Sequence, residues 1–270
     1  DCAEAVAATL VAGTTERQAA TAMGAWLHER GVRHYFHHPF AWFGDRTAFA
    51  GFRVPLQFFP TDRALEPGMP YILDVAPVVD GCTADIGYTG ALGDNPVLDL
   101  LFDDLEAYRG LILDGVRARH NLRAVYDDVD DLIRVHGYEN RHRAYPFGVI
   151  AHRVHYQPGG GRALSAGRFG LRALRGLARD VRAGRRGGWS PLWGPAASSD
   201  HPPRPGLWAV EPHLGFRGVG AKFEELLVVT DDDAYWLDDD LPHVRRWAGR
   251  KAPAVPNPTP TPTPEAEVTA

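Results

Sequence analysis

Residues 71–85 read YILDVAPVVDGCTAD, and this stretch decides the fold of the chain. Its first nine residues are apolar except for Asp74, which is typical of a buried strand, and Asp80-Gly81 is a hairpin turn signal after which the chain returns. A hairpin of this kind places Asp74 beside Asp85, with the two backbones about 5 Å apart. Two like charges so placed repel each other unless a cation lies between them. The stretch therefore predicts a pair of carboxylates that share a cation.

Two further carboxylates lie in or beside apolar runs that are expected to form strands. Glu211 lies in the run 206–212 (GLWAVEP), and Glu224 precedes the run 226–230 (LLVVT). A carboxylate inside an apolar strand is costly without a partner. Four such acids, together with a histidine on a strand, favour a site for a hard cation with oxygen and nitrogen ligands.

These motifs resemble those of the pita-bread metallopeptidases, the family that contains methionine aminopeptidase, Xaa-Pro aminopeptidase and prolidase. The paired-aspartate hairpin, the Glu-Pro motif at 206–212 and the stretch 220–230 (GAKFEELLVVT) follow one another in the family's order and spacing. The resemblance extends over residues 14–240. It implies an α+β pita-bread fold, in which a curved antiparallel sheet carries helices on its outer face and two halves are related by a pseudo-two-fold axis.

The resemblance also implies a dinuclear metal centre. Its ligands would be five side chains, namely Asp74, Asp85, His152, Glu211 and Glu224. Asp85 and Glu224 would bridge the two ions, and His142 is the alternative to His152 as the histidine ligand. The ions would be divalent Mn, Co, Fe or Zn, with Mn favoured, since carboxylate-rich sites with one histidine accept all four.

A centre of this kind implies hydrolysis. Two divalent ions about 3.5–4 Å apart lower the pKa of a bridging water, and the hydroxide attacks a carbonyl group that one ion polarises. Glu211 or Glu224 would pass the proton to the leaving amine, and a histidine would stabilise the oxyanion. The implied reaction is the removal of an N-terminal residue or the cleavage of an Xaa-Pro peptide bond, so the implied partner is a small peptide.

The two histidines that handle substrate in these peptidases are missing from their expected places. The corresponding positions, seventeen or eighteen residues before Asp74 and seven after His152, hold residues without an imidazole, namely Leu56, Gln57 and Gly159. Three histidines could replace them: His37, His38 and His155. We expect His38 and His155 to act beside Glu211 in catalysis. If neither does so, the alternatives are a metalloenzyme for a small non-peptide molecule or a binding module without activity.

The rest of the sequence sets broader limits. The 270 residues carry a net charge of −5, and two cysteines exclude both a disulfide framework and a cysteine-rich zinc site. No run of 18 apolar residues is present, so no membrane span is expected. No signal-peptide pattern is visible, and we expect a cytoplasmic protein.

Local patterns predict the main helices. Thr15 and Gln18 form a capping box at the start of one helix. Residues 98–120 and 122–136 have helical periodicity, and the aromatic segment 32–59 reads as strand.

The chain is expected to form one metallohydrolase domain over residues 1–251, followed by a disordered Pro/Thr-rich tail over 252–270. Within the domain, 159–205 reads as a Gly-, Arg- and Pro-rich insertion. Residues 162–186 carry eight arginines against one aspartate, a net charge of +7, on an amphipathic helix. The insertion is either a surface element, with a homodimer contact as one use, or a lid for an anionic group of a substrate. The negative net charge of the chain argues against a nucleic-acid partner.

Overall fold

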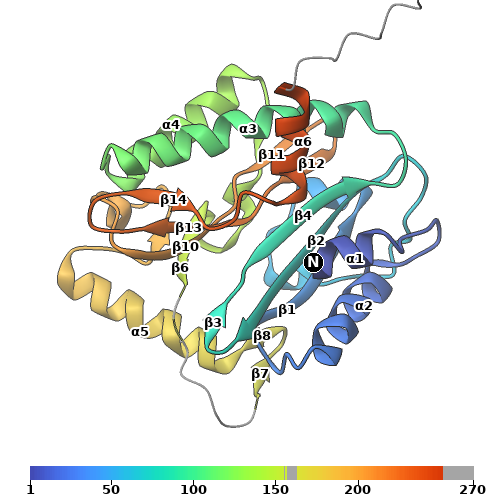
Figure 1. Ribbon diagram of the computed structural model, residues 1–270, viewed down its shortest axis with the longest axis horizontal. Coiled ribbons are helices and arrows are strands. Elements are labelled where there is room, and N and C mark those ends of the chain that lie inside the picture. The colour runs from blue at the N-terminus through green and yellow to red at the C-terminus, as the bar shows by residue number, and fades with distance from the viewer. Residues whose placement is uncertain (155, 157–162, 252–270) are drawn as a thin grey trace, which may run out of the picture.

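The computed structural model describes residues 1–154, 156 and 163–251. Figure 1 shows two bodies of strands, one built mainly from the first third of the chain and one from its second half, with helices on their outer sides. The expected tail at 252–270, as well as His155 and Gly159, lies outside the described residues.

The N-terminal half is an antiparallel sheet with two helices packed against it. The helices are α1 (Cys2–Ala7) and α2 (Glu16–Glu29), and the capping box at Thr15 is confirmed by a 3.2 Å bond from Gln18 N–H and a 2.8 Å bond in return. The strand order is β3-β2-β1-β8-β7, with β4 also paired to β2. The strands are β1 (His34–Phe43), β2 (Pro70–Val79), β3 (Cys82–Thr83), β4 (Ile86–Ala91), β7 (Ser165–Ala166) and β8 (Phe169–Gly170).

The expectation that residues 32–59 are strand throughout is wrong beyond Phe43. The amide of Phe43 donates to the buried carboxylate of Glu16 at 2.9 Å, and the chain then enters a 3₁₀ helix at Gly44–Ala48 and another at Pro55–Phe58. Arg46 in the first of these also binds Glu16, at 2.8 Å. The strand therefore ends where the backbone amide of Phe43 bonds to a carboxylate and not to a neighbouring strand.

The C-terminal half is a second antiparallel sheet, reached through α3 (Pro96–Arg117) and α4 (Leu122–Val135). Its strand order is β14-β13-β10-β6-β9. The strands are β6 (Ala151–Val154), β9 (Leu192–Trp193), β10 (Gly206–Val210), β13 (Glu225–Val229) and β14 (Ala234–Trp236). Figure 1 shows α3 and α4 side by side on the outer side of this sheet, with α6 (Pro242–Lys251) next to α3. Their apolar faces and this sheet share the largest core of the described chain.

A small third sheet and one backbone bridge join the halves. The third sheet has the order β12-β11-β5 and consists of β5 (Glu139–Asn140), β11 (His213–Phe216) and β12 (Val219–Lys222). Gly87 on β4 pairs with Glu224, and Thr89 Oγ1 donates to the backbone carbonyl of Lys222 at 2.6 Å. The two sheets thus meet edge to edge at residues 87–89 and 222–224.

The expected basic helix is confirmed as α5 (Leu171–Gly187), which lies below the second sheet in Figure 1 and contacts β1 and β8 of the first. Short 3₁₀ turns at His142–Ala144, Pro146–Gly148 and Ala197–Ser199 complete the described elements. No helix among the described ranges is long and apolar enough to cross a membrane.

Candidate metal centre

Four carboxylates converge at the junction of the two halves. Asp74 lies on β2 and Asp85 in the link before β4, whereas Glu211 follows β10 and Glu224 lies between β12 and β13. Each of the four residues is at most 9% exposed. They form three overlapping groups whose candidate ligand atoms lie within 4.8 Å of one another: His37, Asp74 and Asp85; Asp85, His152 and Glu224; and Asp74, Glu211 and Glu224. Since each half supplies two of the acids, the cluster exists only in the complete fold.

Two imidazoles complete the cluster. His37 Nε2 lies 3.2 Å from Asp74 Oδ1 and 3.3 Å from Asp85 Oδ1. His152 Nε2 lies 3.1 Å from Asp85 Oδ2, and the ring of His152 stacks on Phe36 with the centroids 4.8 Å apart. Each histidine therefore holds a ring nitrogen among the carboxylates, and neutral imidazole is the commonest metal ligand.

A lysine is buried among the same acids. Lys222 is completely buried, and its ammonium donates to carboxylate oxygens of Asp74, Glu211 and Glu224 at 2.7, 2.8 and 2.9 Å. The ring of Tyr145 lies 5.4 Å from Lys222 Nζ, within the range of a cation–π contact. Lys222 and Glu224 are two residues apart, and this spacing brings both side chains to the cluster.

The buried acids around Lys222 shift one another's pKa values. Burial opposes the charge of Lys222, but the three carboxylates hold its pKa well above the usual value. Burial raises the pKa of Glu211; Lys222 opposes this and Asp74 adds to it. Burial also raises the pKa of Glu224, as do the charges of Asp85 and Glu211. In this part of the cluster, one ammonium is thus shared among three carboxyl groups whose negative charges oppose one another.

On the aspartate side of the cluster, the pKa of Asp85 shifts in the opposite direction to those of Glu211 and Glu224. Burial alone would raise the pKa of Asp85, yet His37 and His152 bring it below its usual value. Burial likewise opposes the charge of His37, but Asp74 and Asp85 raise its pKa to about 9. The imidazoles thus stabilise charged carboxylates in the interior.

The donor set fits a divalent cation. Asp74 Oδ1 and Asp85 Oδ1 are buried; among the described residues His37 Nε2 lies 3.2 and 3.3 Å from them, but neither oxygen accepts a hydrogen bond of good geometry. Buried oxygens are rarely left in this state, and a bound ion would satisfy both of them. Carboxylate oxygens with one or two imidazoles suit Mn, Fe, Co and Zn.

The structure brings one of the histidines expected from the sequence to the cluster and places two others outside it. His152 joins the cluster, whereas His142 is buried elsewhere, with Nε2 2.7 Å from Asn140 Nδ2. His38 does not join it, because its ring stacks on Tyr35 at 4.7 Å and its Nε2 lies 3.0 Å from Ser165 Oγ.

The sequence motifs do not predict two members of the cluster, His37 and Lys222. A bulge in β1, where the pairing with β2 shifts between His37 and Phe40, decides which histidine faces the acids. No sequence pattern signals this bulge. For Lys222 a signal exists, because side chains two residues apart on an extended chain point to the same face.

The cluster forms one end of an aromatic cavity of about 330 Å³. The remaining lining is almost entirely apolar, and most of it is aromatic: Phe36, Phe40, Trp42, Phe58, Phe59, Tyr145, Phe147 and Phe169. Leu174 and Leu177 of α5 close one side. No arginine or lysine lines it in the described ranges. The centre therefore faces a space suited to an apolar group.

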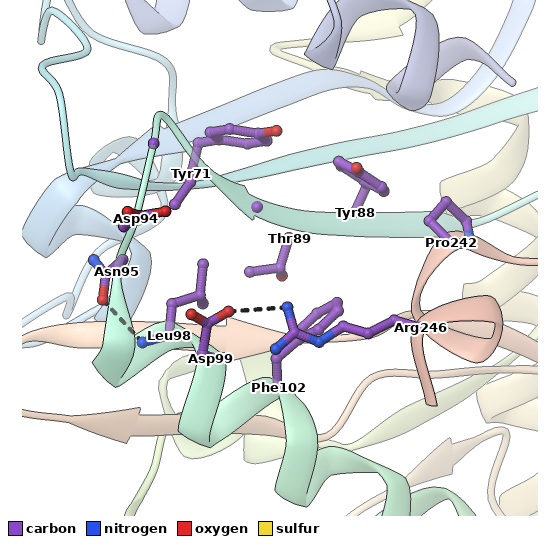
Figure 2. Close-up of a pocket in the computed structure, with 13 residues that line it drawn as sticks. Tyr71, Tyr88, Thr89, Asp94, Asn95, Leu98, Asp99, Phe102, Pro242 and Arg246 are labelled. Atoms are coloured by element: carbon purple, nitrogen blue, oxygen red, sulfur yellow. Dashed lines mark hydrogen bonds and ion pairs between the residues drawn. The ribbon is translucent and has the colours of Figure 1, made fainter. Parts of the chain in front are cut away.

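A separate cavity of about 320 Å³ lies between β4 and α3 (Figure 2). The carboxylate of Asp99 points toward the guanidinium of Arg246 across it, at 2.9 Å. None of the cluster residues lines this cavity.

The sequence profile of metallopeptidase family M24 matches residues 1–231. The chain belongs to family M24. The M24 assignment confirms the expected pita-bread fold, and it agrees with the two antiparallel sheets described above. A comparison with curated protein sequences gives no match.

Solved structures of other M24-like proteins share the fold at low identity. The X-Pro aminopeptidase of Thermotoga maritima MSB8 is 17% identical with a TM-score of 0.63, over 90% of this chain and 59% of that one. The dipeptidase PepE of Mycobacterium ulcerans is 20% identical with a TM-score of 0.61, over 90% and 55%. The methionine aminopeptidase of Rickettsia prowazekii is 12% identical with a TM-score of 0.55, over 87% and 90%. The M24 chain thus spans less than two thirds of the first two.

Proposed function

We propose that the chain is a divalent-metal-dependent hydrolase that removes an N-terminal residue or cleaves an Xaa-Pro type bond of a small peptide. The observation that carries this proposal is the convergence of four carboxylates and two histidines at one end of an aromatic cavity. Membership of a metallopeptidase family supports it.

The metal ligands in this proposal are Asp74, Asp85, His152, Glu211 and Glu224, and the cofactor is two divalent ions, with Mn favoured. Bound ions of this kind polarise a carbonyl group and activate water. His37 is an additional candidate ligand, since its Nε2 lies beside both aspartates. The ammonium of Lys222 contacts three of these carboxylates, so it competes with a bound ion for their negative charge.

The chain's own residues then handle the substrate and the proton. Glu211 lines the cavity, so its carboxylate can accept a proton from water and deliver it to a leaving amine. The aromatic wall excludes water and holds an apolar side chain next to Glu211. For the oxyanion, His37 lines the cavity beside both aspartates; His38 and His155 stay predictions.

A small non-peptide substrate is the second candidate. The observation that favours it is the lining of the cavity, in which the described residues offer no arginine or lysine for a peptide carboxylate. A neutral apolar amide or ester would fit this lining as well as a peptide would.

The test begins with the metal content of the full chain, measured by elemental analysis after loading with Mn²⁺ or Co²⁺ and dialysis. We expect about two ions per chain, as four carboxylates and two histidines suggest. A panel of peptides with and without proline at the second position is then assayed for release of the N-terminal residue. A folded chain that takes up no ion contradicts both candidates, and uptake without turnover of any peptide favours the second.

A further inference from the structure

A second cavity adjoins the aromatic cavity at helix α5. It has a volume of about 480 Å³ and lies between α5 and the segment 189–199. Five apolar residues line both cavities: Phe147, Val149, Leu174, Leu177 and Leu192. The two spaces therefore adjoin along a shared apolar wall.

The outer cavity differs from the inner one in charge. Arg182 and Arg185 line it, and its described lining contains no aspartate or glutamate. The single acid of α5, Asp180, lies 3.7 Å from Arg153 and 3.8 Å from Arg179. Within the described ranges, no carboxylate lies within ion-pair distance of Arg182 or Arg185. Two guanidinium groups thus face this space with their charge uncompensated.

The far wall of the outer cavity is firmly joined to α5. Trp189 N–H donates to the carbonyl of Gly184 at 3.0 Å, and a Cβ atom at Gly184 would lie 2.4 Å from the carbonyl oxygen of Trp189. The guanidinium groups of Arg153 and Arg204 lie 5.5 and 5.3 Å from the ring of Trp189. The wall is therefore aromatic and packs closely against α5.

Helix α5 sets the distance between the shared apolar wall and the arginines of the outer cavity. From Leu177, in the shared wall, to Arg185 is eight residues, which is about 12 Å along a helix. An extended peptide covers this distance in roughly three to four residues. The inner end suits an apolar residue, and the outer end suits carboxylates.

We propose that the outer cavity binds acidic side chains of a peptide, three to four residues beyond an apolar residue held in the aromatic cavity. Arg182 and Arg185 supply the charge, and Leu174 and Leu177 supply the apolar passage between the two spaces. That this peptide is also a substrate rests on the proposed function, but its binding does not.

The experiment compares two amidated peptides, Phe-Pro-Ala-Glu-Glu-Ala and Phe-Pro-Ala-Gln-Gln-Ala, by titration calorimetry at low salt. The full chain is used with a chelator so that neither peptide is cleaved. We expect the glutamate peptide to bind roughly three- to tenfold more tightly, because two ion pairs at a partly exposed site form. The ratio should fall to about one in an Arg182→Gln, Arg185→Gln double variant. Arg175→Gln is the matched control, since Arg175 is exposed on the same helix and lines neither cavity.

Four results would overturn the proposal: no binding of either peptide, equal affinities, a preference that survives in the double variant, or an equal loss of preference in Arg175→Gln. Hydrolysis is measured separately with Mn²⁺ and Co²⁺. If neither peptide is cleaved while the binding ratio behaves as expected, the proposed function fails and the acidic-peptide site stands. If both are cleaved, the preference should appear in KM and not in kcat.

Discussion

The two halves of the molecule bring similar ligands to the cluster but not the same charge. The N-terminal half supplies one imidazole and two aspartates, and the C-terminal half supplies one imidazole, two glutamates and a lysine: His37, Asp74 and Asp85 against His152, Glu211, Lys222 and Glu224. Lys222 contacts both glutamates and reaches across to Asp74, whereas the oxygens without hydrogen bonds belong to the aspartates. The C-terminal half is thus partly neutralised by its own lysine, whereas the aspartates of the N-terminal half are paired with the imidazole of His37.

The halves are also alike away from the cluster. Each fastens a helix-side arginine to a buried glutamate: Arg46 to Glu16 at 2.8 Å in the first half and Arg109 to Glu225 at 2.9 Å in the second. The two halves therefore share a buried arginine–glutamate pair but bring different charges to the cluster, and both features can be tested.

The largest effect is expected from Asp85→Ala. Asp85 belongs to two of the three ligand groups, and it contacts the histidines of both halves. Removing it should weaken Mn²⁺ binding by about a hundredfold or more, since outer partners of metal ligands alone are worth 10–100-fold. Calorimetric titration with Mn²⁺ measures this. Asp62→Ala, at an exposed acid of the same half, is the control and should bind as the wild type does. Unchanged stoichiometry in Asp85→Ala would exclude it as a ligand.

The next largest effects are expected from Arg46→Ala and Arg109→Ala, which test whether the buried ion pairs stabilise the two halves equally. Each leaves a buried glutamate without its arginine, and each should lower the free energy of unfolding by about 3–5 kcal/mol. Urea unfolding measures it. Arg17→Ala is the control, because its pair with Asp62 is exposed and worth less than about 1 kcal/mol. Separate unfolding transitions in either variant would show that the halves do not unfold as one cooperative unit.

A smaller loss is expected from Gly87→Ala, at the seam between the halves. A Cβ atom there would lie 2.7 Å from Lys222 Cε and 3.0 Å from Glu224 Cβ, so the cluster must shift to admit it. We expect the free energy of unfolding to fall by about 1–3 kcal/mol. Gly24→Ala on α2, with nothing within 4 Å, should be neutral or slightly stabilising. Equal behaviour of the two variants would mean that the seam is loosely packed.

The smallest effect concerns Lys222→Met, which removes the charge difference between the halves. Without the ammonium, three buried carboxylates lack a counter-charge, so a divalent ion should bind more tightly, by about tenfold or 1.4 kcal/mol. The same Mn²⁺ titration measures the change, and Lys222→Arg, which keeps the charge, is the comparison. Weaker binding in Lys222→Met would instead show that the ammonium and the ion act together.

Much of the fold could be predicted because its signals are local. The capping box at Thr15, the hairpin after Asp74 and the apolar faces of α3 and α4 each depend on residues a few positions apart. The carboxylate cluster could be predicted as well, since its acids lie in or beside apolar strand runs and the motif order resembles a family.

The remaining features depend on register and on distant partners. Which of His37 and His38 faces Asp74 is set by a bulge in β1, and a one-residue change of register reverses the faces of a strand. The burial of Lys222 depends on Gly87, 135 positions earlier, which leaves space for its side chain. The outer cavity requires α5 to fold back against the segment at Trp189, and no local pattern encodes that contact.

Lys222 is one of only two lysines in the chain, and this gives the buried ammonium a practical use. An amine-reactive acylating reagent cannot reach a completely buried amino group, so Lys222 is modified only when the cluster opens. The rate of its acylation, followed by peptide mass spectrometry, therefore measures how often the two halves separate at their seam. A divalent ion that links the halves should slow this reaction in proportion to its occupancy. The acylation rate of Lys222 therefore also measures how strongly a bound ion keeps the site closed.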